Sequence, residues 1–253
     1  MRVAIVTPYF RESRVQLERC IESVRRQLEP GVIHMMVADG HPQAWIDTVP
    51  ELRHLKLDRA HGDFGNTPRA LGGLLAASEG FDAIGFLDAD NWLDPDHVGH
   101  CLDTAAATGD IDYVVARRRL VRDDGTVVPV VTRDDRDGSH VDTNCYLLLP
   151  GAFHAIGQWA VMPKALSIVG DRVFLNSLRV QKLGHATCAR PTVNYLCTWA
   201  EMFRAAGETP PSYAKQNVDL APTLRWWKGL DERDRCVVNR LAGADLAATG
   251  VLP

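Results

Sequence analysis

Two carboxylates separated by one small residue are the feature of this sequence best suited to chemistry. Asp88-Ala89-Asp90 follows a short apolar run, 83–87, that is typical of a buried strand. Because side chains alternate between the two faces of an extended chain, Asp88 and Asp90 are expected to point the same way. Like charges this close repel unless a cation lies between them, and Mg²⁺ or Mn²⁺ takes oxygen ligands while keeping positions for water and phosphate. The pattern therefore predicts a divalent metal site with Asp88 and Asp90 as ligands.

Two other interpretations fit the isolated pair. Haloacid-dehalogenase-like phosphatases also place Asp-x-Asp after an apolar strand, with the first Asp as nucleophile. Their pattern continues with a small β-branched residue, where Asn91 and Trp92 stand in this chain. The two acids could also be simple surface residues near a helix that begins at Pro95 with Asp94 as its N-cap. The elements upstream favour the metal site over both.

Further polar groups follow two earlier strands. Val3–Val6 is a continuous apolar run that ends in Thr7, and Val32–Ala38 is a second run that ends in Asp39. Apolar residues at helical spacing lie between the two runs, so the segment predicts a βαβ unit. The carboxyl ends of parallel strands line one crevice in an open α/β sheet, and ligands bind there. We therefore expect Thr7, Asp39 and Asp88 to meet at one edge of the sheet.

The rest of the chain alternates between helical and extended patterns. We expect Leu71, Leu74 and Leu75 on the packed face of one helix, with Gly72-Gly73 allowing close approach. Asp124-Gly125 is a strong hairpin signal. The predicted elements are helices at 66–79, 97–107 and 231–241, a hairpin at 112–131, and strands at 55–57, 142–149 and 183–195.

Composition narrows the class of protein. The chain has 253 residues with a net charge of −4, which argues against nucleic acid as a partner. Its six cysteines include no Cys-x-x-Cys, so they are expected to be reduced core residues. No segment resembles a signal peptide or a membrane span. We expect a cytoplasmic protein, at most peripheral to the inner membrane face.

The ordered set of segments resembles an inverting family 2 nucleotide-sugar glycosyltransferase of the GT-A fold. That resemblance implies a single α/β domain in which helices flank a mostly parallel central sheet, with a smaller acceptor-side subregion. Residues 1–98 would then bind the nucleotide sugar, and 99–253 would form the acceptor side with a C-terminal helical extension. The segments that carry the resemblance are Val3–Tyr9, Leu17–Val24, Val37–Gly40, Asn66–Ala70 and Phe86–Asn91.

The resemblance also implies roles for individual residues on the donor side. The loop after the first strand and the acid after the second would hold the base and ribose, and Tyr9 also offers an aromatic face. Arg69 could reach a phosphate through its fork of donors. The implied donor-binding residues are Thr7, Pro8, Tyr9, Asp39, Arg69, Asp88, Ala89 and Asp90.

On the acceptor side the resemblance implies Asp171 as the general base. The family places a Glu-Asp pair before a helix at this point, whereas this chain has Gly170 followed by Asp171. The plainer interpretation is that Asp171 only caps that helix. Trp159 could stack on a sugar, or it could belong to the core.

Together these features predict a metal-dependent glycosyltransferase. It would move a sugar from a nucleoside-diphosphate sugar, with a UDP-sugar favoured, to a glycan or lipid-linked saccharide with inversion. Two alternatives remain: a haloacid-dehalogenase-like phosphatase, and a non-catalytic module that binds nucleotide sugars or glycans.

Overall fold

The computed structural model describes residues 1–130, 140–216 and 218–252. An eight-stranded sheet in the order β3-β2-β1-β4-β7-β6-β8-β5 forms the centre of this part of the chain. The strands are β1 Val3–Tyr9, β2 Val32–Ala38, β3 Leu52–Lys56, β4 Ala83–Phe86, β5 Trp92–Leu93, β6 Tyr113–Val121, β7 Tyr146–Leu148 and β8 His185–Leu196. β1 is parallel to both β2 and β4, β2 to β3, and β6 to β8. The prediction of a mostly parallel α/β sheet is confirmed.

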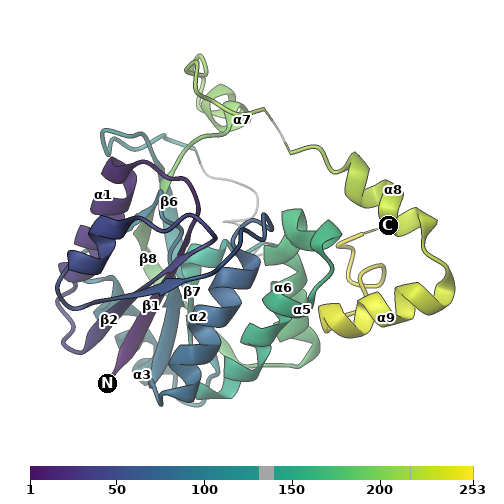
Figure 1. Cartoon of the computed structure of the whole chain (residues 1–253), viewed down its shortest axis with the longest axis horizontal. Helices are drawn as coiled ribbons and strands as arrows, with labels where there is room; N and C mark the ends of the chain where they lie inside the picture. The colour runs from purple at the N-terminus through teal and green to yellow at the C-terminus, as the bar shows by residue number, and fades with distance from the viewer. Residues whose placement is uncertain (131–139, 217, 253) are drawn as a thin grey trace.

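Helices cover both faces of the sheet (Figure 1). Helices α1 and α3 pack on one face, and α2, α5 and α6 pack on the other, with α8 and α9 beyond α5 and α6. Their bounds are α1 Arg14–Arg25, α2 Asn66–Ser78, α3 His97–Thr108, α5 Gln158–Val161, α6 Gly170–Val180, α7 Ala200–Ala205, α8 Ala221–Gly229 and α9 Glu232–Ala242. Short 3-10 turns are η1 Ala44–Thr48, η2 Thr143–Cys145, η3 Pro150–Gly157 and η4 Lys164–Val169.

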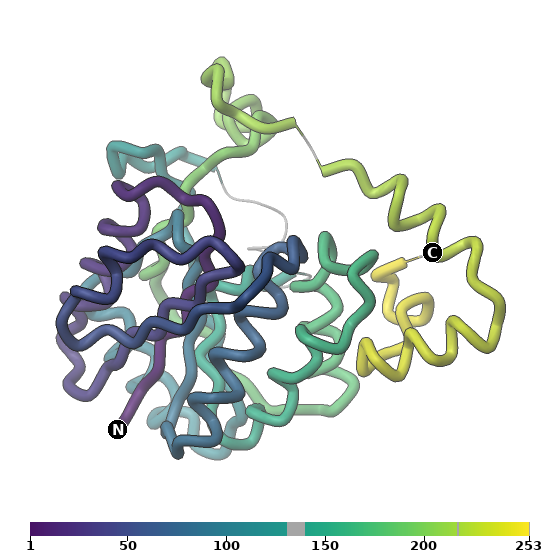
Figure 2. Tube along the Cα trace, in the orientation of Figure 1, coloured from purple at the N-terminus to yellow at the C-terminus, as the bar shows by residue number. Residues whose placement is uncertain are grey.

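The parallel strands place their following loops together. β1 runs upward from the N-terminus in Figure 2, so the loops after β1, β2 and β4 gather on the upper side of the molecule. The register aligns Val3 with Val32 on one side and with Ala83 on the other. The three strands therefore begin level; β1 and β2 end together at Tyr9 and Ala38, whereas β4 ends at Phe86, opposite Val6, so the turn after β4 starts lower at the same edge of the sheet.

A loop that carries α7 closes on itself above the sheet. Lys215 N donates to the carbonyl of Thr198 at 2.6 Å, and Ala200 N donates to the carbonyl of Lys215 at 2.9 Å. The two ends of the segment are thus joined directly after β8. Among the described residues, no helix is both long enough and apolar enough to span a bilayer.

The packed face of α2 differs from the prediction. Leu71 and Leu74 are 40% and 39% exposed, so they do not form the core face. The two glycines face the sheet and η3 instead: a Cβ on Gly72 would lie 2.6 Å from Val6, and one on Gly73 would lie 2.8 Å from Ile156. Because α2 approaches the sheet this closely, small residues rather than leucines occupy its buried side.

Two predicted boundaries are also corrected. The helix after the acidic pair begins at His97 with Asp96 as its N-cap, because Asp94 instead accepts hydrogen bonds from Arg119 and Asn194. The predicted hairpin has its turn at Gly125, but pairing beyond it is reduced to a single bridge between Val121 and Val127. The predicted end of that hairpin, Val131, lies outside the described residues.

Trp159 belongs to the core, so the stacking role is wrong. Its side chain is 1% exposed. The ring stacks on Phe174 at 3.9 Å between centroids and meets Phe86 edge-on at 4.8 Å. Arg69 lies on its other side, with Cζ 5.5 Å from the ring centroid. Trp159 therefore packs α5 against α6 and the sheet.

We expect Trp159→Ala to lower the free energy of unfolding by about 3–5 kcal/mol, because it removes a fully buried aromatic ring. Val161→Ser is a matched control on the same helix, since Val161 is 51% exposed. Denaturant titration of both variants measures the difference. An alanine variant with wild-type stability would contradict the packing role.

Candidate active site

The acidic pair lies in a turn rather than an extended segment. β4 ends at Phe86, and Asn91 N donates to the carbonyl of Asp88 at 3.0 Å. The alternation argument therefore gives the wrong local geometry. The two carboxylates still interact, because the charge of Asp88 raises the pKa of Asp90.

Asp88 is held from two sides. Its Oδ1 accepts from Arg69 Nη2 at 2.6 Å, and its Oδ2 accepts from Asn144 Nδ2 at 2.9 Å. Arg69 stands in the first turn of α2 and is 3% exposed, so it is not a solvent-facing side chain. The side chain of Asp88 is 34% exposed and keeps an open side toward the crevice. Arg69 and Asn144 thus fix the orientation of the first acid of the pair.

Asp90 is more enclosed and less well compensated. No side chain of the described residues donates a hydrogen bond to its carboxylate, while Asp88 and Glu12 add negative charge nearby. Burial is the largest cause that raises the pKa of Asp90 to about 7, followed by the charges of Asp88 and Glu12, and Lys215 acts in the opposite direction. A site of this kind favours an added cation.

The residues present fit a divalent ion bound together with a ligand. In the described ranges, no group of three or more His, Cys, Asp or Glu side chains is placed to hold a metal. Mg²⁺ and Mn²⁺ do not require such a cage, because one or two carboxylates together with substrate phosphates and water suffice. Asp88 and Asp90 supply two carboxylates, and the proximity of Asp88 and Glu12 to the enclosed carboxyl of Asp90 is the observation that favours a cation there.

The side chains at the end of β1 point away from the crevice or pack against neighbouring segments. Thr7 Oγ1 hydrogen-bonds with His34 Nε2 at 2.8 Å, beneath α1. Tyr9 is 2% exposed, and its hydroxyl accepts from Gln43 N at 2.9 Å and pairs with His54 Nε2 at 2.7 Å. Pro8 faces the other side, against Gly65 before α2. Donor binding by Thr7 and Tyr9 stays a prediction, restricted now to their backbone atoms.

Asp39 holds the loop that precedes α2. Its Oδ1 accepts from His61 N at 2.9 Å and lies 2.8 Å from His61 Nδ1, and its Oδ2 accepts from Gly62 N at 3.2 Å. Lys164 Nζ binds the carbonyl of His61 at 2.6 Å from the opposite side. The carboxylate is 5% exposed and is thus used mainly to position this loop. Direct contact between Asp39 and a donor stays a prediction.

Asp171 is paired with a histidine that the sequence did not connect to it. His140 Nε2 makes a short hydrogen bond with Asp171 Oδ2, and Arg172 N donates to Oδ1 at 2.7 Å. Burial favours the neutral form of both groups, yet their mutual attraction outweighs it: the pKa of His140 is raised and that of Asp171 is lowered. Asp171 lies inside the first turn of α6, after Val169 at the N-cap, so it is not that helix's cap.

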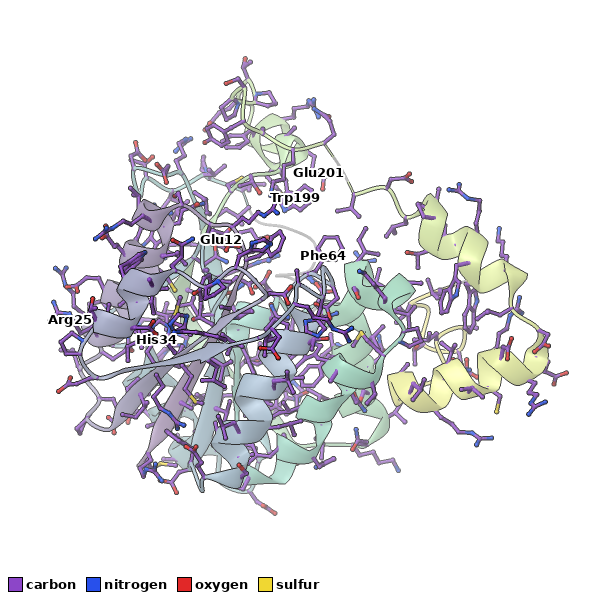
Figure 3. All side chains as sticks on the ribbon, in the orientation of Figure 1. Glu12, Arg25, His34, Phe64, Trp199 and Glu201 are labelled. Atoms are coloured by element: carbon purple, nitrogen blue, oxygen red, sulfur yellow. The ribbon has the colours of Figure 1, made fainter. Side chains whose placement is uncertain are left out.

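A cavity of about 360 Å³ lies beside this pair, and both His140 and Asp171 line it. Asp142 lines the cavity, accepts from Arg118 Nη1 at 2.7 Å, and accepts from Asn144, which also binds Asp88. Trp199 and Glu201, labelled in Figure 3, lie on the same upper side of the molecule as Glu12 and Phe64. The polar residues that line the cavity are Arg118, His140, Asp142, Asp171, Arg172 and Glu201.

Gly170 explains why the first acid of the expected Glu-Asp pair is missing. A Cβ at Gly170 would lie 2.8 Å from Asn66 Nδ2, and Asn66 Oδ1 accepts from Arg69 Nη1 at 3.2 Å. The start of α6 is therefore in direct contact with the start of α2. This contact places the helix that carries Asp171 beside the helix that carries Arg69, and a side chain at position 170 would require Asn66 to move.

Sequence reasoning missed Asn144 and the pairing of His140 with Asp171. Asn144 precedes an apolar strand of three residues, and a single Asn before a strand carries no distinctive signal. Asn144 is important because of its position in the fold, where it is 1% exposed and donates hydrogen bonds to both Asp88 and Asp142.

Comparison with known proteins identifies the family. The profile described as Glycosyl transferase family 2 matches residues 4–161, and the chain belongs to this family. This confirms the resemblance to family 2 glycosyltransferases that was drawn from the sequence. No curated protein matched the chain.

Two solved structures show the same fold. The chain is similar to S. aureus TarS 1-349 in complex with UDP, with a TM-score of 0.60 and 14% identity, over 81% of this chain and 63% of that one. It is also similar to S. aureus TarS 1-349 in complex with UDP-GlcNAc, with a TM-score of 0.62 and 12% identity, over 98% and 73% of the two chains. At these identities the likeness confirms the GT-A-like fold.

We expect Asp39→Ala to release the loop at His61 and Gly62, because both amides lose their acceptor. Hydrogen exchange of these two amides should quicken, and the dissociation constant of a nucleoside diphosphate should rise about tenfold or more, as for loss of a hydrogen bond to a charged group. Asp58→Ala, in the same loop, is the control. Weaker binding with unchanged exchange would instead identify Asp39 as a direct ligand.

The His140–Asp171 pair should make stability depend on pH. A raised histidine pKa adds stability below about pH 6.5 that is lost as pH rises through the folded-state pKa, and a lowered aspartate pKa adds stability above about pH 3.9 that is lost as pH falls. The stability difference between wild type and His140→Asn should therefore be largest between about pH 4 and 6.5. Urea unfolding across pH measures it, and a difference independent of pH would contradict a charged pair.

Proposed function

We propose that this chain transfers a sugar from a nucleoside-diphosphate sugar, with a UDP-sugar favoured, to a hydroxyl acceptor with inversion. The observation that carries this is the contact between the starts of α2 and α6 at Gly170 and Asn66. Because the helix that carries Asp171 packs there beside the helix that carries Arg69, the partner of Asp88, the contact supports one site shared by these residues. The TarS structures in complex with UDP and UDP-GlcNAc support the choice of nucleotide.

Asp171 suits the role of general base. Its lowered pKa keeps the carboxylate ionised at neutral pH, and each oxygen retains a lone pair beyond its bond to His140 or to the Arg172 amide. An acceptor hydroxyl in the cavity can pass its proton to this carboxylate as it attacks the anomeric carbon. His140 then stabilises the position of the carboxylate and moderates its charge. One displacement of this kind inverts the configuration at the anomeric carbon.

The leaving diphosphate gains charge as the glycosidic bond breaks. Asp88 and Asp90 are the residues that would hold Mg²⁺ or Mn²⁺, and such an ion stabilises developing phosphate charge as a Lewis acid. Arg69 holds Asp88 in place from the protein side. Lys215, which is exposed and acts electrostatically on Asp90, adds positive charge at the same point.

The two halves of the chain bind different substrates in this proposal. We assign residues 1–98 to the donor and 99–253 to the acceptor, because the acidic turn ends the first part and the cavity lies almost wholly in the second. The acceptor is a glycan or a lipid-linked saccharide. A cytoplasmic location, with contact at most with a membrane surface, remains a prediction.

The phosphatase alternative fits the site less well. The phosphatase pattern continues with a small β-branched residue after the acidic pair, whereas Asn91 and Trp92 follow it in this chain. A module that binds without catalysis would not need the paired, ionised Asp171 beside a cavity. Family membership favours transfer over both.

We expect UDP to bind weakly without a divalent ion, because the carboxylates of Asp88 and Asp90 would repel the diphosphate. Calorimetry with Mg²⁺, with Mn²⁺ and with EDTA tests this, and Asp90→Ala should lose most of the metal-dependent gain. Equal affinity under chelation would remove the metal from the proposal.

Asp171→Asn keeps the shape of the side chain but cannot accept the proton. We expect transfer to fall about 10²-fold or more, the usual scale for loss of a general base. UDP affinity should change little, and the melting temperature should fall no further than that of His140→Asn, which breaks the same ion pair. Glu201→Gln is the control, because Glu201 also lines the cavity but is exposed. Near wild-type transfer by the Asp171 variant would place the base elsewhere.

A further inference from the structure

The cavity beside Asp171 is polar on one side and apolar on the other. We propose that the acceptor carries an apolar group, alkyl or aryl, directly beside the sugar that reacts, and that the wall formed by Ile168, Met202, Val218 and Leu220 binds this group. The inference rests on the proposed function. It narrows the acceptor from any saccharide to a glycoside with an apolar aglycone.

The polar side fixes where the reacting hydroxyl lies. His140, Asp142 and Asp171 come from the segment before β7 and from the start of α6. Asp142 is tied through Asn144 to Asp88, so this side faces the donor. A hydroxyl that gives its proton to Asp171 must therefore enter from the polar side.

The apolar wall comes from other elements. Ile168 stands in η4, Met202 in α7, and Val218 and Leu220 lead into α8. Val218 is 40% exposed, and the other three are only partly buried. Ile168 and Leu220 rest on the main core while part of each side chain remains open to the cavity. A pocket lined by partly exposed apolar side chains and a few convergent polar groups is typical of a site for a ligand with an apolar portion.

Trp199 and Tyr195 are the aromatic side chains of this cavity. Arg118 covers one face of Tyr195, with Cζ 4.9 Å from the ring centroid, while Trp199 Nε1 donates to the Tyr195 hydroxyl at 3.4 Å. The hydrogen bond orients the indole so that its ring lines the cavity. An amphipathic ring at this place suits the junction between a sugar and its apolar group.

The volume sets a limit on the acceptor. About 360 Å³ is at the lower end of small-molecule sites. One sugar ring and a short alkyl or aryl group fit such a space. Asp171 and the apolar wall line the same small cavity, so we expect the apolar group on the reacting sugar itself.

The test compares phenyl with methyl glycosides of glucose, galactose, mannose and N-acetylglucosamine as acceptors for UDP-sugars. We expect at least one phenyl glycoside to have a KM about tenfold or more below that of its methyl counterpart, as burial of an apolar group would give. Leu220→Ser should remove most of this preference while UDP affinity stays unchanged. Leu241→Ser is the matched control, since Leu241 is 36% exposed on α9 and does not line the cavity.

The possible outcomes distinguish failure of the inference from failure of the proposed function. Equal KM values for phenyl and methyl glycosides would overturn the inference, and so would a preference that survives Leu220→Ser. In either case the proposed function would still hold if the protein binds UDP and transfers sugar. If the serine variant loses its fold, Met202→Ser replaces it, with the same expected loss of preference. A wild-type protein that neither binds UDP nor transfers sugar refutes the proposed function, and the inference falls with it.

Discussion

The ion pair between Arg69 and Asp88 is the contact on which the arrangement of the site depends. Arg69 is almost fully buried, and a buried guanidinium without a partner is strongly unfavourable. Asp88 meets that requirement from the end of β4, and Asn144 holds the other oxygen from η2. Three segments far apart in the chain are thereby fixed at one point. The acidic turn consequently has a defined orientation before any ligand arrives.

A second constraint joins the two halves through small residues. Gly72 and Gly73 let α2 approach the sheet and η3, and Gly170 lets α6 approach the first turn of α2. Each position leaves no room for a Cβ without movement of its neighbour. At Gly73 and Gly170 the backbone of one side therefore packs directly against a side chain of the other, Ile156 and Asn66 respectively. Rigid contact of this kind suits a reaction in which the base and the reacting carbon must keep a fixed separation.

The sequence predicts the order of the elements well, because apolar runs and turn residues act locally. β2 runs over the range predicted for it, and α2 ends one residue earlier than expected. The contacts of single side chains are predicted less well, because they depend on segments that are distant in the sequence. Trp159 faces Phe86 and Phe174 rather than a sugar, and Tyr9 is held by His54 from a strand over forty residues later. No local pattern contains that information.

The closed loop around α7 has a consequence for how the cavity can change. Its ends are joined by hydrogen bonds between Lys215 and residues 198–200. A change in the length of the loop would therefore leave the position of the neighbouring strand in the sheet unchanged. The entropic cost of a longer loop grows only slowly with its length. Glu201 and Met202, which line the cavity, lie inside this loop. Insertions or exchanges between residues 203 and 214 would therefore reshape the entrance to the cavity while the strands that carry Asp88 stay in place, which makes this segment the natural point at which to alter acceptor choice by design.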